Sequence, residues 1–167
     1  MNSARYHTFW RRFWAGLLDS LIFWPFAWID AQVQSFNLPS TLLSVWLLVS
    51  YLAFSIYVVL MHARYGQTVG KMLTGVTVLS YSGQVPISFR QAVIRESPYI
   101  GLLLIGWATV SADLLTSGGL NMPLWVANLL NFAAFIWFAL EIITMLFNDK
   151  RRALHDYIAG TVVVRNP

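Results

Sequence analysis

The chain has 167 residues, of which 57% are hydrophobic and only 11% are charged. This composition predicts an integral membrane protein with one domain over residues 1–167 and argues against a separate soluble domain. The absence of cysteine excludes disulfides and thiolate metal sites. The formal net charge of +4 does not indicate nucleic-acid binding, because the placement of the basic residues follows the topology rule for membrane proteins.

Four apolar segments are predicted to cross the membrane as helices in one all-α bundle, at about residues 13–31, 42–61, 98–116 and 123–147. Basic residues gather before the first span, between the second and third spans, and after the fourth. The short connections around residues 30–41 and 117–124 have none. Since basic loops stay in the cytoplasm, both termini and the central segment are expected there.

The segment between the second and third spans has strand and interfacial-helix patterns. Val76 to Leu79 is rich in β-branched residues and is predicted to pair with Thr161 to Val164, which forms a small cytoplasmic two-stranded sheet. Ser88 and Gln91 fit a capping box, which predicts that an amphipathic interfacial helix begins there, ahead of the third span. His62, at the inner end of the second span, is expected to face solvent.

Gly66-Gln67-Thr68-Val69-Gly70-Lys71 has some features of a phosphate loop. It has one residue too few between its glycines, and Met72 replaces the Ser or Thr that would bind magnesium. We therefore predict no nucleotide site, and no other cofactor or metal site is predicted.

Two carboxylates are expected inside the apolar spans. Asp19 lies on nearly the same helix face as Arg12, and Glu141 lies shortly before the inner end of the fourth span. Both side chains are expected roughly 10 Å into the membrane from the cytoplasmic side. A carboxylate at that depth indicates a functional site unless an arginine or backbone donors satisfy it. Both interpretations remain open, as does whether Asp19 and Glu141 face each other.

The stretch from Asn148 to Val164 resembles the closing signature of the RDD family of small bacterial membrane proteins. Further matches follow in order over about residues 10–165, namely Arg12, Ala15 and Asp19, then Gly66 to Lys71, then Gly83 and Arg95.

The RDD family is named after one arginine and two aspartates. Arg12 and Asp19 match the first two by spacing, and the third is Asp156 or, alternatively, Asp149. The resemblance implies a helical domain of the bacterial inner membrane that is suspected of transport and has no assigned enzymatic activity.

The predicted sheet would bring C-terminal charges close to Arg12 at the inner mouth of the bundle. A network of this kind is more often architectural than catalytic. Its candidate members, besides Arg12, are Lys71, Arg95, Glu96, Asp149, His155 and Asp156.

Two functions are compatible with these patterns. The first is a secondary transporter or antiporter of a proton or monovalent cation, in which Asp19 and Glu141 bind the ion and Arg12 and Asp156 gate the cytoplasmic side. Four helices without an internal repeat are few for alternating access, so a homo-oligomer would supply the second half. The second function is a non-catalytic scaffold or assembly partner of other membrane proteins. An enzyme is not expected, because the sequence has no nucleophile triad or HExxH motif.

Overall fold

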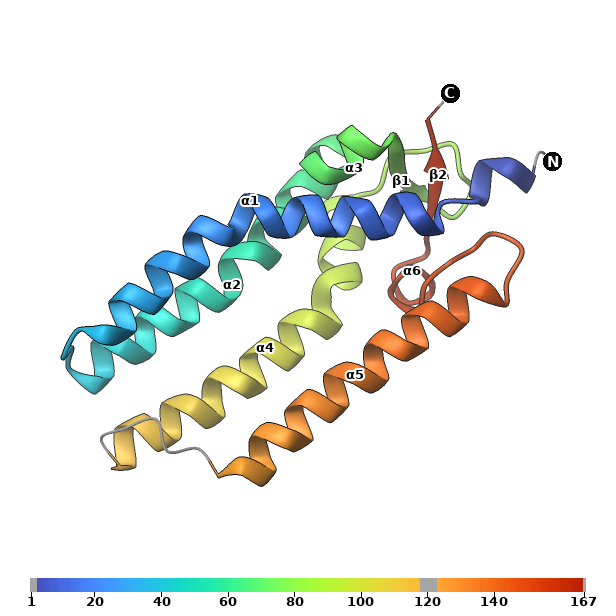
Figure 1. Ribbon diagram of the computed structural model, residues 1–167. Helices are drawn as coiled ribbons and strands as arrows, with labels where there is room; N and C mark the ends of the chain where they lie inside the picture. The colour runs from blue at the N-terminus through green and yellow to red at the C-terminus, as the bar shows by residue number, and fades with distance from the viewer. Residues whose placement is uncertain (1–2, 118–122, 167) are drawn as a thin grey trace.

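The computed structural model describes residues 3–117 and 123–166. Four long helices run side by side, and the short elements gather at one end of them, which we call the sheet end (Figure 1). Both chain ends also lie there. The long helices are α1 (Phe9–Ser35), α2 (Ser40–Tyr65), α4 (Phe89–Ser117) and α5 (Leu124–Leu146). The short elements are η1 (Ser3–Tyr6), α3 (Val69–Thr74), β1 (Val76–Ser80), α6 (Leu154–Ile158) and β2 (Thr161–Arg165).

Three of the long helices, α2, α4 and α5, are long and apolar enough to cross a membrane. They correspond to the second, third and fourth predicted spans, which confirms the helical membrane class. The helix α1 has 27 residues and is therefore long enough, but it carries Arg11, Arg12, Asp19 and Asp30 and is not among these three.

The two-stranded sheet is confirmed. β1 and β2 pair antiparallel, with Val76 opposite Arg165 and Ser80 opposite Thr161. Val78 and Val163 pack against Val59 near the end of α2 that lies at the sheet end, whereas the opposite face of β2 is covered by Tyr6 of η1. Because both faces of β2 are covered, its run of β-branched residues is buried without alternation.

The interfacial amphipathic segment is the first part of α4 and not a separate helix. The capping box is present, because the Ser88 N–H donates to Gln91 Oε1 at 3.0 Å and the Gln91 N–H donates to Ser88 Oγ at 3.2 Å. The helix then continues through Pro98. A proline removes one backbone hydrogen bond and bends a helix without always ending it, and the ribbon of α4 changes direction near its beginning (Figure 1).

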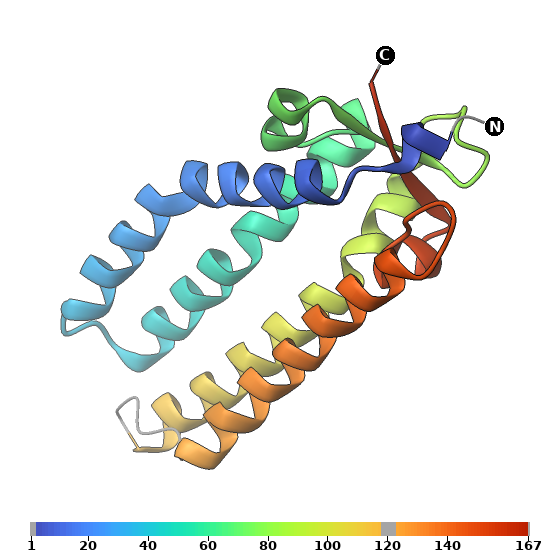
Figure 2. The same cartoon turned by 45° about the vertical axis from the view of Figure 1, so that its right-hand side comes forward.

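Among the long helices, α2 and α4 pack most closely on each other, and α1 and α5 pack more loosely against them. Both views show α1 beside α2 and α5 beside α4 (Figure 2). Between α2 and α4, Ser44 Oγ donates to Ser111 Oγ at 2.8 Å, and Leu43, Leu47 and Leu114 pack together nearby. Interhelical hydroxyl bonds of this kind are worth about 1 kcal/mol in lipid.

Candidate functional site

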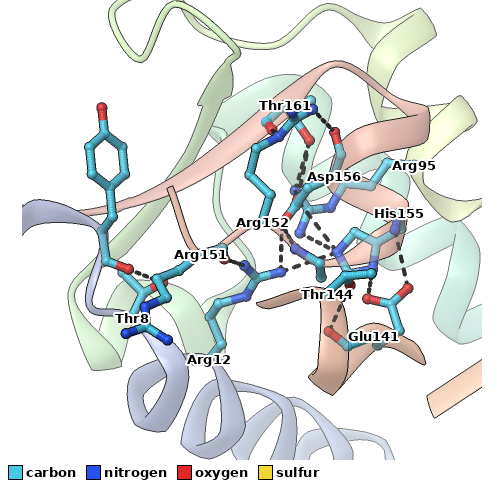
Figure 3. Close-up of polar contacts among 12 residues, drawn as sticks. Thr8, Arg12, Arg95, Glu141, Thr144, Arg151, Arg152, His155, Asp156 and Thr161 are labelled. Atoms are coloured by element: carbon cyan, nitrogen blue, oxygen red, sulfur yellow. Dashed lines mark hydrogen bonds and ion pairs between the residues drawn. The ribbon is translucent and has the colours of Figure 1, made fainter. Parts of the chain in front are cut away.

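Asp156 lies at the centre of a buried charge network at the sheet end (Figure 3). It belongs to α6, and its side chain is fully buried. Its Oδ2 is 2.8 Å from Arg12 Nη2 of α1, and its Oδ1 is 2.6 Å from Arg95 Nη1 of α4. The Ala153 N–H and the Thr161 hydroxyl also donate to this carboxylate. One side chain therefore connects α1, α4, α6 and β2.

Two arginines decide the charge of Asp156. Burial alone would raise the pKa of this carboxyl group, but Arg12 and Arg95 outweigh burial and hold the pKa well below its usual range. Asp156 is therefore ionised at physiological pH. Removing one partner from such a buried pair leaves an uncompensated charge, which makes this network a strong constraint on the fold.

Glu141 of α5 joins the same network through His155. His155 Nδ1 is 2.6 Å from Glu141 Oε2, and the His155 N–H donates to Glu141 Oε1. On the other side of the ring, Nε2 is 2.8 Å from Arg95 Nη2. Arginine only donates, so Nε2 accepts and the ring proton lies on Nδ1, facing Glu141. Burial and the charge of Arg95 lower the pKa of His155, which favours this neutral tautomer.

Arg152 stabilises the turn between α6 and β2. Its Nε donates to the Thr161 carbonyl at 2.9 Å, and its Nη2 donates to the Asp156 carbonyl at 2.8 Å. The guanidinium also lies 4.7 Å from the centre of the Tyr81 ring and 4.0 Å from that of Tyr157. These contacts fix the backbone that presents Asp156.

Asp19 occupies a second buried site, between α1 and α3. Its Oδ1 accepts from the Tyr57 hydroxyl at 2.9 Å and from the Gly70 N–H at 2.8 Å, and its Oδ2 accepts from the Thr68 hydroxyl at 2.5 Å. The Tyr57 oxygen in turn accepts from the Val69 N–H. All of these donors are neutral, and together they dock α3 on α1.

The glycine motif after α2 is explained by this docking. A Cβ on Gly70 would lie 2.1 Å from the carbonyl oxygen of Ala15, so only glycine permits the approach of α3 to α1. Gly66 ends α2 with φ at 67°, a left-handed conformation that glycine adopts without strain. Thr68 caps α3 by accepting from the Lys71 N–H. The motif therefore builds a short helix that packs closely on α1.

Lys71, His62 and Glu96 form a third group, in which His62 and Glu96 are buried and Lys71 is half-buried. Lys71 Nζ is 3.0 Å from His62 Nε2. His62 is only 2% exposed, contrary to the expectation that it faces solvent, because β1 and α3 fold back over the end of α2. Its Nδ1 has no hydrogen-bond partner among residues 3–117 and 123–166. Glu96 is also buried, and its Oε1 accepts from the Ser55 hydroxyl at 3.0 Å.

Lys71 has the most unusual electrostatic surroundings in this group. Burial, with the positive charges of Arg95 and Arg12, lowers the pKa of Lys71 to about 7, although Asp19 and Glu96 act in the opposite direction. Lys71 thus changes charge near neutral pH.

Except for Asp149, the residues singled out in the sequence fall into these three groups. In the described part of the chain, no hydrogen bond or ion pair joins Asp19 to Glu141 or to Arg12. Asp149 is exposed in the turn after α5, so Asp156 is the acid that faces Arg12.

Several site residues were missed by reasoning from the sequence. A sequence pattern could have identified Thr68, because it stands where a helix N-cap is expected ahead of Val69. No sequence pattern identifies Tyr57, Arg152 and Thr161, since hydroxyl and guanidinium groups near a membrane surface are common and their contacts depend on the fold.

Comparison with known proteins agrees with this description. The sequence model of the RDD family matches residues 6–160. A protein described as the uncharacterized membrane protein YteJ of Bacillus subtilis is 28% identical over 168 residues, covering 95% of this chain and 80% of that protein. An uncharacterized protein of Haemophilus influenzae is 26% identical over 156 residues, covering 93% of this chain and 76% of that protein.

A shorter similarity links the chain to the uncharacterized protein RP437 of Rickettsia prowazekii, which is 45% identical over 47 residues, or 28% of this chain and 27% of that protein. No solved structure matches the chain. The family match covers nearly the whole chain and includes α1, the glycine motif and α6, which carry the site residues. The chain belongs to the RDD family.

Proposed function

We propose that this protein is a four-span transporter of a proton or monovalent cation in the bacterial inner membrane, and that Glu141 and His155 exchange the proton. The observation that carries the proposal is the contact of 2.6 Å between an intramembrane carboxylate and an imidazole. The neutral imidazole donates its Nδ1 proton to this carboxylate and is placed to pass a proton to or from it. Ionisable groups within spans commonly mark ion and proton pathways.

The four-span topology is supported by the position of the chain ends. The first and last described elements, η1 and β2, both lie at the sheet end (Figure 1), which supports an even number of crossings. If α2, α4 and α5 cross, α1 is the fourth span. The loops at the sheet end carry the basic residues, which supports a cytoplasmic location for that end and for both termini.

Each buried acid has a different role in this proposal. Asp156 stays ionised between Arg12 and Arg95 and has the structural role of connecting α1, α4, α6 and β2. Asp19 is satisfied by three neutral donors and holds α3 in place. Glu141 has the neutral His155 as its partner, so it is the acid best suited to exchange a proton for a cation. Two copies of the chain would supply the second half of an alternating-access pathway.

The test is a flux measurement with the purified full chain in liposomes that contain an internal pH dye. Added sodium or potassium should change the internal pH when wild-type protein is present. Glu141→Gln should abolish the response, because the amide still accepts from His155 but cannot release a proton. Asp149→Asn, which alters an exposed carboxylate at the same end of the molecule, should keep it. A response that survives in Glu141→Gln would contradict the assignment.

A scaffold is the second candidate, and the exposed aromatic surface of α1 favours it. Trp10, Trp14, Trp24 and Trp28 are between 52% and 70% exposed in the single chain, and such a surface suits lipid or other membrane helices. A wild-type protein that gives no flux but copurifies with a fixed membrane partner would support this function instead.

A further inference from the structure

The buried carboxylate with the weakest compensation is Glu96 of α4. Its only hydrogen-bond partner in the described part of the chain is the neutral Ser55 hydroxyl, and no ion pair includes it. By contrast, Asp156 contacts two guanidinium groups, Asp19 has three donors, and Glu141 has His155. A buried carboxylate requires a nearby positive charge to stay ionised.

Two cations lie near Glu96, and one of them already pairs with another carboxylate. Arg95 is 2.6 Å from Asp156 and also bonds to His155. The second is Lys71, whose ammonium group hydrogen-bonds to a histidine and, within residues 3–117 and 123–166, to no carboxylate. Lys71 is therefore the cation that remains to balance Glu96.

The side chains of this group follow one face of α2. Ser55 and His62 are two helical turns apart, or roughly 10 Å along the axis. Ser55 contacts Glu96 at the deeper level, and His62 contacts Lys71 closer to the sheet end. The lysine thus lies between the sheet end and the buried carboxylate.

We propose that Lys71 is a tethered cation that balances Glu96, and that a monovalent cation replaces it when the lysine releases its proton. One proton leaves Nζ and one cation enters, so the charge of the site is unchanged. This proposal rests on the transport function and adds a cation site to it.

His62 couples the two states. When Lys71 is charged, Nζ donates to His62 Nε2, and the ring proton lies on Nδ1. When Lys71 is neutral, its nitrogen can accept as well as donate, which allows the ring proton to move to Nε2 and leaves Nδ1 as an acceptor. That atom has no other partner in the described residues, so it is a second buried acceptor about two helical turns closer to the sheet end than Glu96.

The groups around Lys71 favour a change of charge near neutral pH. Arg95 and Glu96 face it from α4, Arg12 and Asp19 from α1, and His62 from α2. Burial and the two arginines lower the pKa of Lys71 to about 7, whereas Glu96 raises it. Sodium or potassium ions then compete with protons in the physiological range.

The sequence makes a direct test possible, because Lys71 and Lys150 are the only lysines. The full chain, labelled with 15N-lysine, is titrated in detergent while the two Nζ resonances are followed at low and high sodium or potassium. N-methylglucamine, which is too large for the site, keeps the ionic strength constant. Lys71→Arg assigns the signals, and Lys150 serves as the reference in the same sample.

The titration midpoint of Lys71 should fall as the small cation is added, by about one pH unit at ten times its Kd. In Glu96→Gln the midpoint should be lower and should no longer depend on the cation. A wild-type midpoint that does not respond to sodium or potassium, or a response that persists in Glu96→Gln, would overturn the proposal.

The outcome is separable from that of the flux assay. A cation-dependent Lys71 signal in a protein that gives no flux would keep the site and remove transport. Undiminished flux in Lys71→Arg, whose charge cannot be removed, would keep transport and remove the role of Lys71.

Discussion

At the scale of the residue, the buried charged groups contribute to stability in ways that depend differently on pH. Asp156 is held by two arginines, which lower its pKa, so its contribution to stability is complete above about pH 4 and is lost only as the pH falls further. Lys71 behaves differently, because its pKa is lowered to about 7. Lys71 therefore makes stability depend on pH above about 7.

The Lys71 shift predicts a pH dependence of known sign. An unfolded lysine titrates near 10.4, so between about pH 7 and pH 10 the unfolded chain binds more protons than the folded one. The free energy of unfolding should therefore rise from pH 7 to pH 9. Lys71→Met should remove this part of the rise, whereas Lys150→Met should keep it. Unfolding midpoints in mild detergent at the two pH values measure the effect, and equal slopes in wild type and Lys71→Met would contradict it.

At the scale of the element, α3 is held in place by one buried acid and one close backbone contact. Asp19 accepts hydrogen bonds from α3 and from Tyr57. Gly70 has no side chain, so the backbone of α3 can contact that of α1. Left-handed glycines, Gly66 and Gly75, stand on either side of α3.

Substituting Gly70 tests this docking. In Gly70→Ala the new methyl group would meet the Ala15 carbonyl, so α3 should detach and residues 66–75 should lose protection from hydrogen exchange. The long helices should keep theirs. Gly16→Ala is the matched control on α1, since nothing lies within 4 Å of its new Cβ, and it should stabilise the helix by up to about 1 kcal/mol. Equal protection of α3 in both variants would contradict the docking.

Much of the element level could be predicted from the sequence, because it depends on local patterns. Apolar runs gave three spans, β-branched residues gave both strands, and Ser88 with Gln91 gave the start of α4. The continuation of α4 through Pro98 could not be predicted, since a proline either ends or bends a helix depending on its neighbours. The pairing of Arg12 with Asp156 spans 144 positions, and a local pattern does not show which helix faces meet.

At the scale of the whole molecule, the charges at the sheet end connect the outer helices α1 and α5 to α4. Arg12 comes from α1, Arg95 from α4 and Glu141 from α5. Asp156 and His155 of α6 lie between them. The network therefore ties α1 and α5 to the closely packed helices α2 and α4.

The proposed orientation of the molecule is testable because the chain has no cysteine. Asn37→Cys, in the exposed connection between α1 and α2, should react with an impermeant maleimide on intact bacterial cells. Ser82→Cys, in the exposed turn after β1, should react only after lysis. Labelling of both positions from the same side would contradict four spans with both termini in the cytoplasm.

The pairing of Arg12 with Asp156 is the central claim, and a double-mutant cycle in unfolding tests it most directly. Arg12→Met and Asp156→Asn should each destabilise the protein by about 3–5 kcal/mol, because each leaves a buried charge with less compensation. The double variant should lose less than the sum, by about 1–3 kcal/mol. Arg11→Met, whose guanidinium bonds to the Thr74 carbonyl, should instead add to Asp156→Asn. If Arg12 and Asp156 are also additive within about 0.5 kcal/mol, the two residues do not act as a pair.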